Sequence, residues 1–436
     1  MNSKPQSLAI DGGPPVRPRP WPQWPYFAED EIQAVAEVLR SGRVNYWTGP
    51  IFSGDDGSAI RGLTGRFETE FARWIGTKYA VAVPNGTLAL ELCLYALNIG
   101  PGDEVIVPNR TYIASALAVA VRGAIPVFAD IDRNSQNISA ATIRPVLTPR
   151  TRAIICVHLG GCPCEMAEIM ALAEEHHLKV IEDCAQCLGA KYRERRLGSI
   201  GHMAAFSFCH DKIMTTGGEG GMITVNRPEL YCRAWSYKDH GKNFHRYQLP
   251  LHHPLADAAL AARQTDYTSI GTNWRMTEMQ AAIGLRQLTK VPEWVVIRRR
   301  FAAMLDAGLA DVPGLIVLPP PPPHFYHAYY KYYALLRIEK LAEGWTRDRV
   351  IAAINAEGVF CTYGSNWDLG REDVWNTTID PISGSCRQLR LSEPLPNDHY
   401  FGLRSMMFQV HPTLNEEAIQ DTIAAVRKVL AAAVTP

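Results

Sequence analysis

The chain has 436 residues, which is longer than one common domain and predicts two to three domains. Hydrophobic residues make up 47% of it and charged residues 20%, so it can bury a core and does not have the composition of a disordered polymer. Lys and Arg number 44, as do Asp and Glu. Without a net basic charge, nucleic acid is not an expected partner.

No stretch reaches the roughly 18 to 20 uninterrupted apolar residues that a membrane-spanning helix requires. The most apolar segment, residues 112–129, contains Arg122 and Pro126. The first residues carry no apolar run of signal-peptide length. We therefore expect no membrane partner and a cytoplasmic location.

The ten cysteines are scattered through the chain, and in a cytoplasmic protein we expect them to be reduced thiols. One grouping, Cys162-x-Cys164 followed by Cys184-x-x-Cys187, offers the four thiolates of a structural zinc site. Against it, Cys184 ends the apolar run KVIEDC, where neighbouring side chains point to opposite faces. We predict no metal site.

In chain order, residues 1–27 are predicted to form an extended arm, because residues 1–26 hold seven prolines. This arm would lie on the rest of the molecule or on a second subunit. A helix is expected from Glu29 to the glycine at 42, since apolar residues recur there at helical spacing.

Residues 28–290 are predicted to form a large cofactor-binding α/β domain. Seven short runs are continuously apolar, as in strands covered on both faces, and segments 87–97 and 165–176 have helical patterns between them. We therefore expect a mainly parallel seven-stranded sheet between helices. The seven runs are YAVAV, EVIVP, IPVFADI, TRAIICVHL, LKVIEDC, MAAFSF and GGMITV.

A long helix from Thr277 to about Asp306, broken near Pro292, is expected to leave this domain. The proline run 319–323 should stay extended. One strand-like segment, KYYALLRI, and two helical ones, RDRVIAAINAEG and NEEAIQDTIAAVRKVLAAAV, follow. They predict a smaller C-terminal α+β domain over residues 291–436.

The motifs of P-loop nucleotide hydrolysis, zinc proteolysis, α/β-hydrolases and dinucleotide binding are not found in the sequence. Polar residues instead follow the predicted strands, where open α/β sheets bind ligands. In VPNGTLALEL, Gly86 and Thr87 open a helix whose first amides can donate to phosphate. An ordinary helix cap formed by Asn85 or Thr87 is an equally good interpretation of this segment alone.

In VIEDCAQ, Asp183 ends an apolar run, so its carboxylate should be buried and should need a cationic partner. A protonated pyridine nitrogen would serve, and the ring would then act as an electron sink. Gln186 could contact the same ring, although a solvated residue at a helix start is the alternative.

In FSFCHDKIMTTGGEGG, Ser207 and Lys212 follow a core-type strand and precede a glycine-rich turn. Such a lysine would be partly desolvated, leaving the free amine that Schiff-base formation requires. A lone lysine is usually a surface charge, so this interpretation depends on the neighbouring motifs.

From about Tyr26 to the end, the chain resembles the sugar aminotransferases of the DegT/DnrJ/EryC1/StrS family, which are pyridoxal-phosphate enzymes of fold type I. The residues that carry the resemblance are NGTLALEL, GPGDEVIVP, TYIASALAV, PVFADID, VHLGG, VIEDCAQ, LGSIG, FSFCHDKIMTTGGEGG and GTNWRMTEMQAAIGLRQL.

The resemblance implies that Lys212 holds pyridoxal 5'-phosphate as a Schiff base, that Asp183 pairs with the pyridine nitrogen and that Gln186 contacts the ring. It also places Gly86, Thr87 and Ser207 on the cofactor phosphate, and it makes Tyr112 the aromatic residue stacked on the ring. In similar enzymes the asparagine equivalent to Asn273 reaches the phosphate bound by the neighbouring subunit. A homodimer with shared active sites is therefore expected.

The expected reaction is transamination in two halves, from an amino acid, glutamate or glutamine by resemblance, to a keto-sugar that is nucleotide-linked. A free keto-cyclitol and an aminobenzoate-type ring are lesser options for the acceptor. The amino-sugar would serve a surface polysaccharide or a secondary metabolite. Two alternatives are a pyridoxamine-phosphate-dependent sugar dehydratase and a non-catalytic regulator that only binds the cofactor. Retention of Lys212 argues against the dehydratase.

Overall fold

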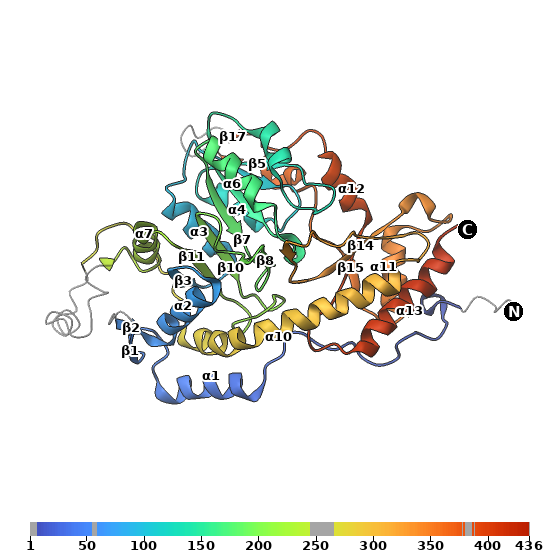
Figure 1. The fold of residues 1–436 in the computed structure, drawn as a ribbon, viewed down its shortest axis with the longest axis horizontal. Coiled ribbons are helices and arrows are strands. Elements are labelled where there is room, and N and C mark those ends of the chain that lie inside the picture. Colours follow the sequence, from blue (N-terminus) through green and yellow to red (C-terminus); the bar gives the residue numbers. More distant parts are fainter. Residues whose placement is uncertain are drawn as a thin grey trace.

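A computed structural model of the chain describes residues 7–54, 59–244, 266–376, 378–379, 386–387 and 389–435. Figure 1 shows a larger α/β body and a smaller body, joined by the long helix α10. None of the described helices is both long enough and apolar enough to cross a membrane.

The larger body contains a seven-stranded sheet in the order β3-β11-β10-β7-β6-β4-β5. Strand β11 runs antiparallel to both of its neighbours, and the other adjacent pairs are parallel. The predicted seven-stranded, mainly parallel sheet is confirmed. Its strands in chain order are β3 (Tyr79–Val83), β4 (Glu104–Pro108), β5 (Ile125–Ala129), β6 (Thr151–Val157), β7 (Lys179–Asp183), β10 (Met203–Ser207) and β11 (Gly221–Val225).

Both faces of this sheet are covered by helices, which explains why the strands are continuously apolar. Along β3, Ala82 belongs to the hydrophobic core on one face, whereas Val81 and Val83 belong to the core on the other. The first face packs against α2 (Gly62–Ile75), α6 (Met166–Glu175) and α10 (Glu278–Leu309). The second packs against α3 (Gly86–Ala96), α4 (Ala114–Val121) and α7 (Pro228–Lys238).

Helix α10 runs unbroken from Glu278 to Leu309, so the predicted break near Pro292 is wrong. Pro292 lies on the exposed side of the helix, while Val291 and Trp294 on the inner side are buried in the core. Packing on that inner stripe therefore keeps the helix continuous. The predicted domain boundary between residues 290 and 291 falls inside this helix.

The smaller body is built on a four-stranded antiparallel sheet in the order β12-β14-β18-β15. The second half of α10 packs with its helices around one core that includes Phe301, Leu305, Val350 and Val426. Its elements are β12 (Leu315–Val317), β14 (Tyr332–Leu336), α11 (Arg347–Ala356), β15 (Cys361–Tyr363), α12 (Pro396–Arg404), β18 (Ser405–Phe408) and α13 (Glu416–Ala433).

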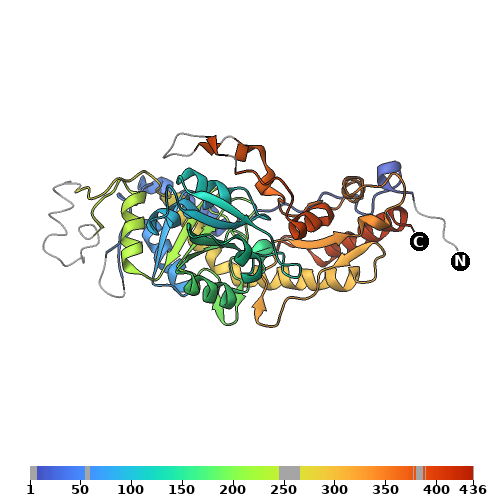
Figure 2. The same ribbon diagram turned by 90° about the horizontal axis from the view of Figure 1, so that it is seen from above.

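Several short elements surround the two bodies, and one of them, β13, pairs with β8 of the larger body although it follows α10 in the chain. A hairpin, β16–β17, projects above the larger body in the view of Figure 2. The short elements are α1 (Glu29–Ser41), β1 (Ile51–Ser53), β2 (Ala59–Arg61), α5 (Ala140–Ile143), β8 (Lys191–Tyr192), β9 (Arg195–Arg196), β13 (Phe325–Tyr326), β16 (Thr378–Ile379) and β17 (Cys386–Arg387).

The proline-rich N-terminal arm lies along the smaller body of its own chain. Leu8 is buried in that body's core, and the Glu357 carboxylate accepts hydrogen bonds from the backbone N–H groups of Ala9 and Val16, at 2.9 and 3.0 Å. The arm is also held by an ion pair of 2.7 Å between Arg17 and Asp421.

Candidate active site

Three of the predicted site residues, Asp183, Ser207 and Lys212, lie at or just beyond the carboxyl ends of two neighbouring strands of the large sheet. Asp183 is the last residue of β7 and Ser207 the last of β10, and these strands are parallel neighbours in which Ala205 pairs with Asp183. Lys212 lies in the loop that follows β10. The turn into α3 follows β3, which is separated from β10 by β11 alone (Figure 1).

Two glycines allow the α3 turn to approach the end of β10 closely. A Cβ atom at Gly86 would lie 2.6 Å from the Cβ atom of Ser207, and one at Gly221 would lie 2.3 Å from the carbonyl oxygen of Asn85. Distances this short cannot be tolerated without movement. Glycine at both positions therefore keeps the backbone of the turn, the Ser207 hydroxyl and the end of the sheet within one small space.

The start of α3 combines a helix cap with free backbone amides. Asn85 Oδ1 accepts a hydrogen bond of 3.0 Å from the Leu88 N–H, so the capping interpretation is right for Asn85. The amides of the first turn, including that of Thr87, have no intrahelical partner. A phosphate seated here would meet these amides, the Ser207 hydroxyl and the positive end of the helix dipole.

Asp183 is buried, with 4% of its surface exposed. Its carboxylate accepts hydrogen bonds from Ser115 Oγ at 2.9 Å and from the Ala185 N–H at 3.1 Å. Burial raises the pKa of this carboxyl, and the two hydrogen bonds and the charges of His158 and Lys212 oppose that rise. A cation beside Asp183 would offset the burial cost, as a protonated pyridine nitrogen does.

Gln186 is also buried, with 9% of its surface exposed, so the solvated alternative for this residue is wrong. Its Oε1 accepts a hydrogen bond of 2.7 Å from the Gly160 N–H. The contact joins the loop after β7 to the VHLGG stretch after β6 and fixes the side chain close to Asp183.

Lys212 is mostly buried, with 19% of its side chain exposed. Its Nζ lies 3.0 Å from Asp211 Oδ1 and donates to Tyr330 Oη at 3.3 Å. Although burial alone would raise the pKa of Asp211, the charges of Lys212 and Lys331 and a hydrogen bond from the Tyr330 hydroxyl hold it below its usual value. The lysine amine is thus oriented by an ionised carboxylate and a phenol.

In the part of the chain that the structure describes, the side chains of Tyr112 and Asn273 form no hydrogen bond or ion pair with these groups. Tyr112 is 63% exposed, and its carbonyl oxygen accepts from the N–H of Ser115, the residue that contacts Asp183. Asn273 is exposed and forms a backbone bridge with Asp239. The roles implied for both by resemblance stay predictions.

Sequence reasoning missed several groups that support the site. Tyr330 is 118 residues from the lysine that it contacts. Trp24, on the N-terminal arm, donates its indole N–H to the Lys212 carbonyl oxygen at 3.0 Å. Ser115 could have been found, because it lies one helical turn after Tyr112 in a segment that already resembled the family.

The residue before Asp183 anchors the opposite side of β7. Glu182 is fully buried and accepts backbone hydrogen bonds from Gly198, Ile200 and Gly201 at 2.7 to 2.9 Å. His158 Nε2 lies 3.2 Å from Glu182 Oε2. Adjacent carboxylates on one strand therefore point to opposite sides, and the LGSIG motif serves to hold Glu182.

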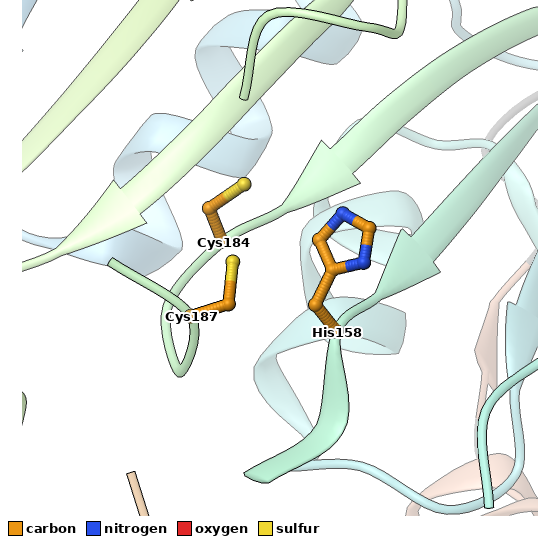
Figure 3. Close-up of side chains that lie close together, drawn as sticks. All are labelled: His158, Cys184 and Cys187. Atoms are coloured by element: carbon orange, nitrogen blue, oxygen red, sulfur yellow. The ribbon is translucent and has the colours of Figure 1, made fainter. Parts of the chain in front are cut away.

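The four cysteines that the sequence offered as an alternative zinc grouping, Cys162, Cys164, Cys184 and Cys187, do not form one cluster. His158, Cys184 and Cys187 lie together instead, with the two sulfur atoms close to the imidazole ring (Figure 3), while Cys164 Sγ donates to the carbonyl oxygen of Val157. His158 Nδ1 accepts from the Cys164 N–H at 3.1 Å and Nε2 faces Glu182. Burial raises the pKa of both thiols of the trio, so they are held protonated.

The DegT/DnrJ/EryC1/StrS aminotransferase family model matches residues 25–427. The chain belongs to this family. The family uses pyridoxal phosphate, and its solved members share fold type I.

Individual relatives are similar over most of the chain. GDP-perosamine synthase of Caulobacter vibrioides is 42% identical over 296 residues, which cover 67% of this chain and 73% of that protein. The L-glutamine:2-deoxy-scyllo-inosose aminotransferase of Streptoalloteichus tenebrarius is 35% identical over 338 residues, 76% of this chain and 74% of that one. The X-ray structure of the aminotransferase from Psychrobacter cryohalolentis is 44% identical, with a TM-score of 0.84 over 95% of this chain and 99% of that one.

The residues present fit the family's cofactor. The buried carboxyl of Asp183 needs a cation. The space between Gly86 and Ser207 would be filled by any side chain added at Gly86. The Lys212 amine lies at the same edge of the sheet. Pyridoxal phosphate carries a basic ring nitrogen, a phosphate and an aldehyde that match these three features. A pocket of about 930 Å³ between α1, α2 and α10 contains none of these residues.

Proposed function

We propose that this transaminase moves an amino group from glutamate or glutamine to a nucleotide-linked keto-sugar, giving an amino-sugar for a surface polysaccharide or a secondary metabolite. The observation that supports it most is the position of the Lys212 amine and the Asp183 carboxylate at one edge of the sheet. The name of the Caulobacter relative, GDP-perosamine synthase, supports a nucleotide-linked acceptor. The name of the Streptoalloteichus relative supports glutamine as a donor and a cyclitol as a lesser acceptor option.

In this proposal, Asp183 holds the pyridine nitrogen in its charged form, and Gly86, Thr87 and Ser207 bind the phosphate. Gln186 and Tyr112 contact the ring. Bound pyridoxal phosphate supplies an aldehyde that takes up an amino group and a ring that accepts electrons.

Lys212 is the catalytic residue, because its Nζ takes the proton from the substrate carbon and returns it on the cofactor side. Asp211 and Tyr330 position that nitrogen through an ion pair and a hydrogen bond. The carboxylate of Asp211 is kept ionised by its neighbours, so it favours the protonated amine after each proton transfer. Both half-reactions use the same groups in opposite order.

The working form in this proposal is a cytoplasmic homodimer with two shared active sites. Asn273 is exposed in the single chain and stands beside the backbone of Asp239. This exposure supports a role for Asn273 across the subunit interface, on the phosphate bound by the partner.

The test is amination with purified components. The holoenzyme is incubated with glutamate or glutamine and a panel of nucleotide-linked keto-sugars, and products are identified by mass spectrometry. We expect an amino-sugar only when donor and acceptor are both present. A deoxy-sugar formed without a donor would contradict transamination and indicate a dehydratase, and cofactor binding without conversion by any donor would indicate a regulator.

A further inference from the structure

The loop between β10 and Lys212 carries three consecutive side chains with metal-binding atoms. Cys209, His210 and Asp211 place a sulfur, an imidazole nitrogen and a carboxylate oxygen within 4.8 Å of one another. The Cys209 Sγ lies 3.4 Å from His210 Nδ1, and it lies 3.9 Å from Oε1 of Glu219, at the end of the glycine-rich turn. Four potential ligands of different chemistry therefore surround one small space.

The spacing of these atoms fits a tetrahedral cation. In zinc sites the Zn–S bond is about 2.3 Å long and the Zn–N and Zn–O bonds about 2.0 to 2.2 Å, so neighbouring ligand atoms lie about 3.5 Å apart. The two distances from the Cys209 sulfur, 3.4 Å and 3.9 Å, are close to that value. The atoms are thus already near the separation that a bound cation requires.

Backbone hydrogen bonds hold the two segments that carry these ligands. The His210 N–H donates to the Gly218 carbonyl oxygen at 3.0 Å, and the Phe208 N–H donates to that of Gly220 at 2.7 Å. From helix α10, Gln280 Nε2 donates to the carbonyl oxygen of Glu219 at 2.8 Å. Because the backbone is fixed on both sides, little order has to be gained when a ligand binds.

These ligands are open to solvent, unlike those of the second His/Cys cluster in the described part of the chain. That cluster, which contains His158, is fully buried, and both nitrogens of its imidazole already have partners. Here, His210 and Glu219 are exposed, and the Asp211 side chain is 37% exposed. A cation can therefore reach this loop from solvent.

The donor atoms select the kind of cation. Thiolate and imidazole ligands favour zinc and similar transition metals, whereas Mg²⁺ and Ca²⁺ prefer oxygen ligands alone. We propose that Cys209, His210, Asp211 and Glu219 form a binding site for a divalent transition-metal cation such as Zn²⁺. The expectation of no metal site rested on the cysteines of residues 162–187, which do not include Cys209.

Occupancy of this site acts on the reaction through Asp211. The Asp211 carboxylate lies 3.0 Å from Lys212 Nζ, and a cation bound to the same carboxylate competes with the lysine for it and repels the lysine ammonium. Bound Zn²⁺ therefore slows transamination. This consequence rests on the proposed function, whereas the binding site itself does not.

The first test measures metal binding directly. Tag-free holoenzyme is titrated with Zn²⁺ in competition with a coloured chelator, and with Co²⁺, whose bond to a thiolate gives a charge-transfer absorption band. We expect one tight Zn²⁺ per chain. Cys209→Ser and His210→Asn should each weaken it by at least about tenfold, since loss of even an outer partner of a metal ligand costs about 10- to 100-fold. Cys209→Ser should also lose the cobalt band.

Cys232→Ser and His176→Asn are the matched controls. Cys232 is another half-exposed thiol and His176 another exposed imidazole, and both lie outside the loop. Their affinity for Zn²⁺ should equal that of the wild type. Glu219→Gln keeps the size of its side chain and removes a ligand charge, so it should weaken binding even if Cys209→Ser does not fold.

Three results of this titration would overturn the site. They are the absence of tight Zn²⁺ binding to the wild type, equal affinity in the loop variants and the controls, and binding of Mg²⁺ as tight as that of Zn²⁺. The second of these would mean that the contact between Cys209 and His210 is only a hydrogen bond.

A second measurement links the site to the reaction. The loss of the cofactor's lysine-bound absorbance with L-glutamate is followed in a single turnover, with the free Zn²⁺ concentration fixed by a metal buffer. We expect Zn²⁺ to slow the wild type and Cys232→Ser but not Cys209→Ser. Equal inhibition of Cys209→Ser, or an unchanged rate in zinc-loaded wild type, would overturn the inhibitory role. Failure of the metal-free wild type to react with any amino acid would instead overturn the proposed function and leave the metal site intact.

Discussion

Trp24 of the N-terminal arm donates its indole N–H to the backbone carbonyl oxygen of Lys212, at 3.0 Å across 188 residues of sequence. The same indole packs edge-on against Trp294, with ring centroids 5.2 Å apart, and stacks on His411. The arm thus reaches from the smaller body to the loop that carries Lys212. It couples the position of that loop to the packing between the two bodies.

Replacing Trp24 by Phe should loosen the Lys212 loop. The variant loses the indole hydrogen bond, so we expect stability to fall by about 1 to 2 kcal/mol and turnover by roughly tenfold. Trp21→Phe is the control, since it removes a similar bond, from Trp21 to Gln409 at 2.7 Å, elsewhere on the arm. Thermal melts measure the stability of both variants, and steady-state kinetics measure their turnover. Equal turnover in the two variants would contradict a role for Trp24 in positioning Lys212.

Gly86→Ala should weaken cofactor binding through a steric clash. The added Cβ would lie 2.6 Å from Ser207 Cβ, so we expect a stability loss of about 1 to 3 kcal/mol and at least tenfold weaker affinity for pyridoxal phosphate, on the order of one lost hydrogen bond to phosphate. Equilibrium titration with the cofactor measures the affinity.

A second substitution separates the two effects of Gly86→Ala. Ser207→Gly in the same chain removes the atoms that clash, and it should restore the melting temperature but not the affinity, because the Ser207 hydroxyl is a predicted phosphate ligand. If the double variant bound the cofactor as tightly as the wild type, Ser207 would not be a ligand.

Stability should fall as pH rises from about 4 to 6 because of Asp398. Burial raises the pKa of Asp398 to about 6, so the folded chain holds this proton more tightly than the unfolded chain, in which the pKa is about 3.9. The bound proton on Asp398 therefore adds about 3 kcal/mol to the free energy of unfolding below pH 4, and this contribution is lost as the pH rises to about 6 and above. Melting temperatures of wild type and Asp398→Asn across this range check it.

The melting temperature of Asp398→Asn should change less with pH between 4 and 6 than that of the wild type. Asp373→Asn is the control, because the Asp373 side chain is 90% exposed and its removal should leave the profile unchanged. Parallel profiles for wild type and Asp398→Asn would mean that Asp398 does not titrate in this window.

Asn273 can be tested with mixed dimers. Lys212→Ala and Asn273→Ala should each give nearly inactive homodimers. If Asn273 serves the partner's phosphate site, a hybrid dimer has one site with both native residues, so mixing and reannealing the variants should restore up to half of the activity per hybrid. Unrestored activity in hybrids verified by mass spectrometry would place Asn273 in its own subunit's site or outside both.

The sequence predicted the sheet and the strand-end residues because these depend on local pattern. Asp183 ends a run of apolar residues, and a polar residue in that place lies at the end of a buried strand whatever fold the rest of the chain adopts. Pro292 was misjudged for the opposite reason: local propensity forbids it inside a helix, but packing of Val291 and Trp294 overrides propensity in α10.

The contacts around Lys212 could not be predicted locally. Tyr330 and Trp24 approach the lysine across 118 and 188 residues, and neither lies in a pattern that indicates a site. The hydrogen bond from Arg110 to Ser405 likewise could not be found from local sequence, because Ser405 is 295 residues away.

The most direct test of the whole interpretation is to reduce the holoenzyme with borohydride, which fixes a C=N bond between cofactor and protein, and to map the modified peptide by mass spectrometry. We predict that the pyridoxyl group is found on Lys212, and that Lys212→Ala shows neither the modification nor turnover. Attachment at another lysine, or undiminished amination by Lys212→Ala, would contradict the assignment of Lys212 as the catalytic residue.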